Sequence, residues 1–326
     1  MVPDWLRIIL SLLTIASFIP QFHLIWSRKS ANGISLLYVL YNLISATEQF
    51  ALNFGFVVLI EPADDAVFVH NPPSVGDWLN FAQTIVFMSQ FLVYFALALW
   101  FPSNRSTPPQ KRLILGTYVI YLVTAIVPLL VCAIINSIND DQSAWHEFPT
   151  VITFTPHTTC LNYVATVAAM FGTYYEIRVL EEKQPEPQPV SSTADDHSAA
   201  SLPAREEEEE EGDDTLTSSS PNGSLSLLGL AVQCVLFIIL AVSWIFRVSF
   251  PPLPDGVHWW SSSYVLEVWY ELVGSIAVDN AVFGMGQGIL LYLARKKERC
   301  DGDANGQVEG EEGLAGEREP LLGGTM

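Results

Sequence analysis

The stretch that decides the fold lies near the start of the chain and reads Ile19-Pro20-Gln21, then Ser27-Arg28-Lys29-Ser30-Ala31-Asn32-Gly33-Ile34-Ser35. It lies between two long apolar runs. A proline inside a membrane-length helix removes a backbone donor, so Pro20 marks a kink or hinge. Gln21 brings an amide donor and acceptor to membrane depth, where unsatisfied polar groups are costly. Asn32-Gly33 predicts a turn into the next helix.

This stretch resembles the signature of the PQ-loop repeat family, in which a Pro-Gln pair ends one helix, a Lys-Ser loop follows and Gly-x-Ser opens the next helix. That family includes cystinosin, the vacuolar basic amino acid exporters and, more distantly, the SWEET sugar transporters. The resemblance covers residues 18–38. It implies seven transmembrane helices in a 3+1+3 plan, with two parallel three-helix repeats joined by an inverting linker helix.

The composition is that of a membrane protein with two acidic segments. Half of the 326 residues are hydrophobic, yet the formal net charge is −20. Residues 186–214 carry eleven acidic residues and residues 298–319 carry eight more, out of 35 in the chain. These segments have almost no apolar content and cannot bury enough surface to offset chain entropy, so we expect them to be disordered.

Seven stretches are long and apolar enough to cross a hydrocarbon layer of about 30 Å. They lie at residues 5–26, 35–60, 78–101, 113–137, 151–179, 225–248 and 264–294. The sequence therefore predicts an all-α membrane protein. Its expected parts are a first three-helix repeat at 1–110, a linker helix at 111–140, a second repeat at 150–295 interrupted by a disordered acidic loop at 183–223, and a disordered tail at 296–326.

The positive charges predict the orientation in the membrane. Of the 15 lysines and arginines, all but Arg7 and Arg247 fall in segments on one side. Cytosolic loops carry an excess of lysine and arginine, so we expect a lumenal N-terminus and a cytosolic C-terminus. The glycosylation sequons at Asn104 and Asn222 then lie in cytosolic loops and are expected to stay unmodified.

An internal repeat supports the 3+1+3 plan. Ser35-Leu36-Leu37 opens the second span and Ser226-Leu227-Leu228 opens the sixth, each shortly after an Asn-Gly pair. Further polar matches follow from this register and from the alignment of Met88 with Met285. They are Asn42 with Gln233, Gln83 with Asn280, and Gln90 with Gln287. Gln83 and Gln90 are spaced i, i+7 in the third span, and Asn280 and Gln287 have the same spacing in the seventh. Residues at this spacing share a helix face.

The second repeat departs from the family signature. Where a second Pro-Gln pair would stand, the chain reads Met170-Phe171-Gly172-Thr173-Tyr174-Tyr175-Glu176. Gly172 can still loosen the helix, and Thr173 or Glu176 can supply a polar group. A mechanism with two equivalent hinges therefore does not carry over from the resemblance.

Two carboxyl groups within the spans are candidates for coupling transport to protons or cations. Asp279 lies about 16 residues before Arg295, roughly 24 Å along a helix, and so in the outer half of the last span. Glu48 lies in the second span. Titratable groups at membrane depth suggest a function by default. The alternative is that each carboxyl only forms a hydrogen bond to a neighbouring helix. We interpret His23 and His157 as packed hydrogen-bonding residues.

The remaining candidates are amides, which either join helices or line a central polar cavity between the repeats. Such a cavity suits a small zwitterion or polyol. Together with the hinge and the carboxyl groups, the candidate substrate and coupling residues are Pro20, Gln21, Asn42, Glu48, Gln83, Gln90, Gln233, Asp279, Asn280 and Gln287.

Other chemistries find little support. The sequence has no phosphate-binding glycine-rich loop, no Cys-x-x-Cys motif and no His, Cys and Asp set with metal spacing. We therefore expect no catalytic residues, metal, cofactor or nucleic-acid partner. Near the C-terminus, Glu317-Arg-Glu-Pro-Leu321-Leu322 fits an acidic dileucine sorting signal that binds a sorting adaptor.

By resemblance, the chain is an endomembrane transporter of a small organic solute in a vacuolar or lysosomal membrane. Amino acids are the first candidates, exported together with protons while one three-helix bundle rocks against the other around Pro20. Two alternatives remain open at this point: a seven-helix receptor, and a sorting receptor that binds its ligand without moving it.

Overall fold

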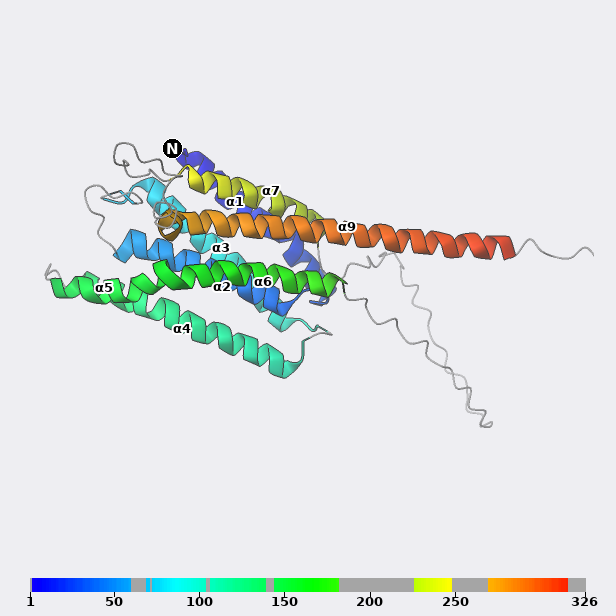
Figure 1. Cartoon of the computed structure of the whole chain (residues 1–326), viewed down its shortest axis with the longest axis horizontal. Coiled ribbons are helices and arrows are strands. Elements are labelled where there is room, and N and C mark those ends of the chain that lie inside the picture. Colours follow the sequence, from blue (N-terminus) through cyan, green and yellow to red (C-terminus); the bar gives the residue numbers. More distant parts are fainter. Residues whose placement is uncertain are drawn as a thin grey trace, which may run out of the picture.

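In the part of the chain that the structure describes, seven helical segments lie side by side along one common direction (Figure 1). The computed structural model describes residues 2–59, 69–70, 72–103, 106–138, 144–181, 226–247 and 269–315, and within these ranges the chain is all-helical. Of residues 144–149, 272–273 and 301–315 the backbone alone is described. The expected acidic loop at 183–223 and the sorting residues Glu317, Leu321 and Leu322 lie outside the described residues.

The first half of the chain contains α1 (Asp4–Arg28), α2 (Leu36–Phe54) with the π-helical turn η1 (Gly55–Leu59), α3 (Val75–Trp100) and α4 (Pro108–Ile138). The second half contains α5 (Ala144–Pro156), η2 (His157–Leu161) and α6 (Asn162–Glu181) in one continuous segment, then α7 (Leu227–Ile245), η3 (Tyr270–Gly274) and α9 (Ser275–Ala315). We call the end of the bundle at which α1 begins the N-terminal end. The opposite end carries the α1–α2 loop.

The turn after α1 forms where the sequence predicts it. Lys29 ends α1 with φ 47° and Gly33 has φ 86°, a left-handed conformation that glycine adopts without strain. The hydroxyl of Ser35 then accepts the amide hydrogen of Tyr38 and begins α2. Ser226 begins α7 in the same way through the amide of Gly229. The two serines matched in the internal repeat are therefore both N-caps.

Five of the segments, α1, α3, α4, α7 and residues 275–300 of α9, are long and apolar enough to cross a membrane by length and composition. The helix α2 carries a polar, buried side and lies inside the bundle, which lowers its hydropathy. Its buried polar residues are Asn42, Ser45, Thr47, Glu48, Gln49 and Asn53. The helix α4 shows the opposite pattern, because most of its apolar side chains are exposed on the outside of the bundle, as for lipid contact.

The packing confirms the two three-helix repeats. In the first repeat α3 packs against α1 and α2, and in the second α9 packs against α6 and α7. The repeats join through α1 with α7 and through α2 with α6, which are equivalent pairs. The helix α4 contacts α2 and α5 and belongs to neither repeat. This is the predicted 3+1+3 plan, with α4 as the linker.

Small residues allow α7 and α9 to approach closely. Gly284 and Gly288 lie one turn apart on the side of α9 that faces α7. A Cβ atom on Gly284 would lie 3.1 Å from Ile238, and one on Gly288 would lie 3.1 Å from the sulfur of Cys234. Helices in membranes associate through such small-residue contacts, since lipid supplies no hydrophobic drive between them.

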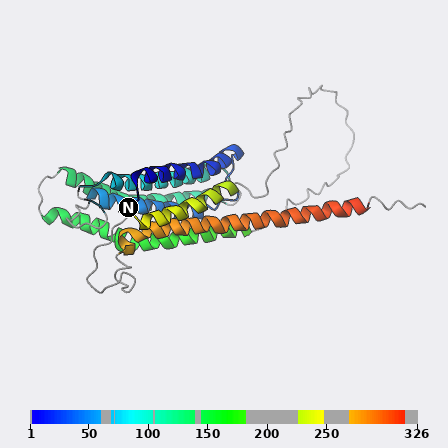
Figure 2. The ribbon, with the colours of Figure 1, turned by 90° about the horizontal axis from the view of Figure 1, so that it is seen from above.

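The end of α9 corrects one expectation. We expected a disordered tail from residue 296, but α9 continues through Ala315 and projects beyond the bundle (Figures 1 and 2). Once a helix exists, each further residue adds a hydrogen bond without a new nucleation cost. Arg295, Lys296, Lys297 and Glu298 are good helix formers, so the helix propagates out of the membrane-spanning part.

Candidate functional site

Asp279 lies at the junction of three helices and is 2% exposed. The hydroxyl of Ser45 on α2 donates to its Oδ2 at 2.8 Å, and the amide of Gln49 reaches the same oxygen at 3.4 Å. The hydroxyl of Thr166 on α6 donates to Oδ1. The carboxyl group of α9 is thus held by donors from α2 and α6, one helix from each repeat.

Glu48, the residue directly before Gln49, is the centre of a second buried cluster. The hydroxyl of Tyr121 on α4 donates to Glu48 Oε2 at 2.7 Å, and Nδ1 of His157 lies 2.7 Å from Oε1. Glu48 and His157 are 0% and 3% exposed. His157 opens the π-helical turn η2 directly after Pro156, which cannot donate a backbone hydrogen bond. We expected His157 to be a packed hydrogen-bonding residue, and Glu48 is its partner.

Two of the three π-helical turns supply residues to these clusters. His157 of η2 contacts Glu48, and Tyr270 of η3 lies with its hydroxyl 2.7 Å from Thr166, the residue that donates to Asp279. All three turns lie toward the N-terminal end of the bundle, which follows from the order of the helices (Figure 1). Such turns are frequent at functional sites because they redirect side chains within a helix.

A small cavity of about 10 Å³, roughly the room that one water molecule needs, lies between the repeats next to these carboxyl groups. Its walls come from α1, α2, α3, α7 and α9. The lining residues are Thr14, Gln49, Gln83, Thr84, Phe87, Phe237, Leu240, Trp244 and Asn280. Gln49 connects this cavity to Asp279 through its side-chain amide. Of the residues expected to line a polar cavity, Gln83 and Asn280 do so.

Phenylalanines close the cavity toward the loop end. Phe87 and Phe237 belong to its wall, and Phe237 packs edge-on against Phe283 with ring centroids 4.5 Å apart. Phe18 and Phe91 complete this layer at 5.3 Å from each other. The layer draws one or two rings from each of α1, α3, α7 and α9. It fills the bundle axis between the cavity and the α1–α2 loop.

Beyond the phenylalanines, two reciprocal contacts join the repeats. The side-chain oxygen of Gln21 accepts the amide hydrogen of Ser226 at 2.9 Å. The carboxyl oxygen Oε2 of Glu176 accepts the amide hydrogen of Ser35 at 2.7 Å. Each acceptor comes from the first helix of one repeat and binds the N-cap of the second helix of the other. Glu176 therefore occupies in the second repeat the place that Gln21 has in the first.

Pro20 lies inside α1, which continues through it to Arg28. It faces α7, where a Cβ atom on Gly229 would lie 3.9 Å from the Cβ of Pro20. The proline is therefore next to the N-cap contact made by Gln21. The missing backbone donor weakens the helix at the point where the two repeats meet.

The other predicted amides lie away from the cavity wall and bond helix to helix or to their own backbone. Gln233 donates to the carbonyl of Ser17 at 3.3 Å, and Asn42 donates to the carbonyl of Tyr38 at 2.8 Å. Gln287 donates to the hydroxyl of Tyr38 at 2.5 Å. Gln90 is half-buried. Gln233 and Gln287 thus join neighbouring helices, whereas the bond of Asn42 stays within α2.

Several site residues escaped sequence reasoning. Thr14, Ser45, Gln49, Thr84 and Thr166 line the cavity or bind Asp279. Four of them are hydroxyl residues, which also bond to their own helix backbone and so give no sign of an inward role in a sequence. The spacing of Ser45, Glu48 and Gln49 along α2 gave one weak indication of a polar site, because these residues share one side of the helix.

The buried carboxyl of Asp279 is a group that can bind and release a proton, and the cavity beside it offers amides and hydroxyls to a small polar solute. Within the described residues, no group of three His, Cys, Asp or Glu side chains lies close enough to hold a metal ion.

Comparison with known proteins agrees with this architecture. Residues 2–59, which comprise α1, the loop after it and α2 with η1, match the PQ loop repeat family. No curated protein and no solved structure matches the chain. Members of the matched family are membrane proteins with seven transmembrane helices. This chain is thus a multi-pass integral membrane protein in which residues 2–59 carry a PQ loop repeat.

Proposed function

We propose that this protein transports a small organic solute, amino acids first, out of an acidic endomembrane lumen together with protons. The observation that carries the proposal is the polar cavity between the two repeats, linked through Gln49 to the buried carboxyl of Asp279. Members of the PQ-loop family are transporters rather than enzymes, which supports the same reading.

Proton binding at Asp279 has a mechanical consequence. An ionised carboxylate only accepts hydrogen bonds, and here it accepts from Ser45, Thr166 and Gln49. A protonated carboxyl must itself donate, so the hydroxyl of Ser45 or Thr166, which can donate or accept, has to reverse its hydrogen bond. Ser45 and Gln49 belong to α2, in the other repeat from Asp279, whereas Thr166 belongs to α6 in the same repeat. A change at Ser45 or Gln49 alters the α2–α9 contact between the repeats, and in this way we link proton transfer to helix movement.

Access alternates as the repeats rock around the closed cavity. In this conformation the phenylalanine layer and the N-cap contacts of Gln21 and Glu176 close the loop end. Opening that end requires these contacts to part, and the weakened helix at Pro20 lies where the parting occurs. The cavity is too small for an amino acid, so solute entry also requires the helices to separate at the N-terminal end.

The orientation and location belong to the same proposal. The positive-charge bias supports a lumenal N-terminus and a cytosolic loop end. The dileucine signal at Glu317, Leu321 and Leu322 supports delivery to a vacuole or lysosome by a sorting adaptor.

A transporter and a receptor are separated by flux. Purified full-length protein is reconstituted into sealed vesicles loaded with the twenty L-amino acids, and release is followed by mass spectrometry with a lumen more acidic than the outside. Release of one amino acid class beyond that of protein-free vesicles supports the proposal. Binding without release identifies a receptor. Metabolite profiles of isolated vacuoles with and without the protein then name the solute.

A further inference from the structure

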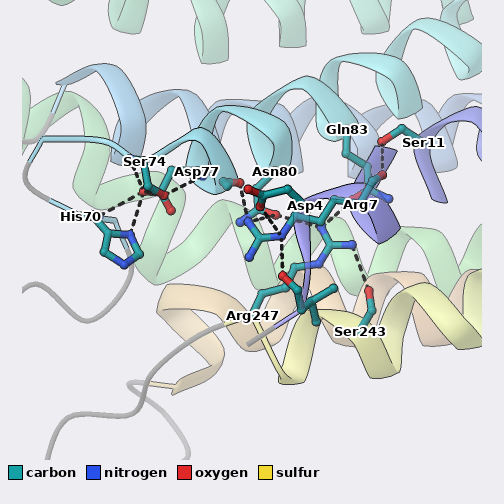
Figure 3. A network of polar contacts seen from close by, with 12 residues as sticks. Asp4, Arg7, Ser11, His70, Ser74, Asp77, Asn80, Gln83, Ser243 and Arg247 are labelled. Carbon is teal, nitrogen blue, oxygen red and sulfur yellow. Dashed lines mark hydrogen bonds and ion pairs between the residues drawn. The ribbon is translucent and has the colours of Figure 1, made fainter. Parts of the chain in front are cut away.

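Two buried arginines meet at the N-terminal end of the bundle (Figure 3). Arg7 near the start of α1 and Arg247 just after α7 both donate to the side-chain oxygen of Asn80 on α3, at 3.3 and 3.0 Å. They are 6% and 7% exposed. Arg247 also donates to Gln83 at 2.5 Å and lies over the ring of Trp244, 4.5 Å from its centroid.

Carboxylate partners are few around this pair. Within the described residues Arg247 has no ion pair, and the ion pair of Arg7 is with Asp4, 3.8 Å away and half exposed. The nearby Asp77 accepts its hydrogen bonds from Ser74 and His70. Burying a charge without a counter-charge is costly.

Donors also outnumber acceptors in this cluster. The two guanidinium groups and two side-chain amides supply many N–H groups. Their acceptors are single oxygens of Asn80, Gln83 and Ser243 and, for Arg7, the carbonyl oxygens of Val2 and Gly76. Nε of Arg247 and the side-chain nitrogen of Gln83 are buried without a hydrogen-bond partner. Both side chains are more than nine-tenths buried. Among the described residues, Arg247 therefore has no anionic acceptor.

The cluster adjoins the cavity of the proposed transport site. Gln83 and Trp244, the two residues that hold Arg247 in place, are also part of the cavity wall. Among the 15 lysines and arginines, Arg7 and Arg247 are also the two that the positive-charge bias leaves on the far side of the membrane. These two arginines therefore do not serve as topology signals, and their burial beside the cavity indicates a role at that site.

We propose that Arg7 and Arg247 bind the carboxylate of the solute as it enters the cavity from the N-terminal end. The fork of N–H donors on an arginine matches the two oxygens of a carboxylate, and the unpaired Nε completes that fork on Arg247. The inference rests on the proposed transport function and narrows its solute class. Amino acids and other carboxylates are ligands, whereas sugars and simple amines are not.

Binding tests this inference without any need for flux. Thermal unfolding of the purified full-length protein in detergent is measured with each of the twenty L-amino acids, with their methyl esters and with the corresponding decarboxylated amines. Amino acids with a free carboxylate raise the unfolding temperature, because ligand bound to the native state stabilises it. The esters and amines do not. Equal stabilisation by acids and esters would overturn the proposal.

Variants locate the site. Replacement of Arg247 by Gln weakens carboxylate binding by about ten- to a hundredfold, the loss expected for a charge-assisted hydrogen bond. Arg247→Lys keeps the charge but not the fork, and gives an intermediate loss. Arg178→Gln, which removes an exposed arginine at the opposite end, is the matched control and binds as the wild type does. Unchanged affinity in Arg247→Gln would overturn the assignment. If that variant does not fold, the wild-type comparison of acids with esters decides alone.

Further arms identify the source of the anion. Chloride, phosphate and vesicles containing phosphatidylserine are added separately at constant ionic strength. If any of these raises the unfolding temperature as much as amino acids do, and amino acids then add no further rise, the assignment of the site to a solute is overturned. Carboxylate binding without flux leaves this inference standing while the transport proposal falls. Flux that Arg247→Gln leaves unaltered removes the inference and keeps transport.

Discussion

Glu176 accepts the backbone amide hydrogen of Ser35 at 2.7 Å, and so repeats across the molecule the contact that Gln21 makes with Ser226. The second repeat lacks a Pro-Gln pair, yet the acceptor expected from such a pair is present as a carboxyl group. In this chain, the glutamine of the Pro-Gln pair therefore serves as a contact between the repeats. A glutamine or a glutamate can both make it, because the contact needs a single side-chain oxygen at one position.

This symmetry predicts the outcome of changes at Glu176. Glu176→Ala leaves the amide of Ser35 without its acceptor and lowers the free energy of unfolding by about 1–3 kcal/mol. Glu176→Gln retains an oxygen and stays close to wild type. Gln21→Ala, at the equivalent position, costs a similar amount. Thermal unfolding of the purified variants measures all three, and a loss in Glu176→Gln as large as that in Glu176→Ala would show that the charge, and not the hydrogen bond, matters.

The phenylalanine layer predicts a second result. Phe237 is 0% exposed and contacts Phe18, Phe87 and Phe283. Phe237→Ala leaves a cavity that costs about 3–5 kcal/mol and opens a path between the central cavity and the loop end. We expect a lower unfolding temperature together with an uncoupled leak of solute from sealed vesicles.

The matched control is Phe171→Ala, because Phe171 is 56% exposed on the outside of the bundle. It is expected to change neither property. A Phe237→Ala protein that shows no solute leak would contradict the role of the phenylalanine layer as a barrier between the cavity and the loop end.

Topology is the third prediction, and follows from the uneven distribution of lysine and arginine. The native sequons at Asn104 and Asn222 stay unglycosylated in cells. A sequon inserted between Glu61 and Asp77 is expected to be modified, because the proposed orientation puts that loop in the lumen. A shift in gel mobility that is removed by a glycosidase measures both. Glycans on Asn104 or Asn222 would invert the proposed orientation.

Sorting is the fourth prediction. Replacing Leu321 and Leu322 by Ala removes the apolar pair that an adaptor groove would bind, and the protein then moves from the vacuolar or lysosomal membrane to the cell surface. Fluorescence microscopy of the tagged full-length chain measures this. Replacement of Leu314 by Ala, outside the motif, serves as a control. An unchanged location of the double variant would remove the sequence support for the organelle.

The order of the helices and the repeat plan could be read from the sequence, because apolar length, proline and Asn-Gly turns act locally. The starts of α2 at Ser35 and of α7 at Ser226 followed from the same signals, whereas their role as N-caps is seen only in the structure. The extension of α9 to Ala315 did not, since acidic composition outweighed the local helix formers in our reading.

The pairing of side chains could not be read in this way. His157 meets Glu48 across more than 100 residues of chain, and Arg7 meets Arg247 through Asn80 on a third helix. These contacts depend on how each helix is rotated about its axis. A membrane helix carries Leu, Val and Phe on several sides, so its apolar pattern does not determine that rotation. Short hydroxyls such as Thr166 add to the difficulty, because a threonine is equally satisfied by its own backbone.

Asp279 provides the most direct test of the account. In sealed vesicles, the wild-type protein accumulates amino acid in response to a pH gradient and also exchanges labelled for unlabelled amino acid at equal pH. Asp279→Asn keeps the size of the side chain and its hydrogen-bonding capacity, and we expect it to retain exchange but to lose pH-driven accumulation. Glu48→Gln, whose partners are His157 and Tyr121, is expected to be milder. A folded Asp279→Asn protein that transports with an unchanged pH profile, or a wild-type protein that moves no solute, would contradict the account.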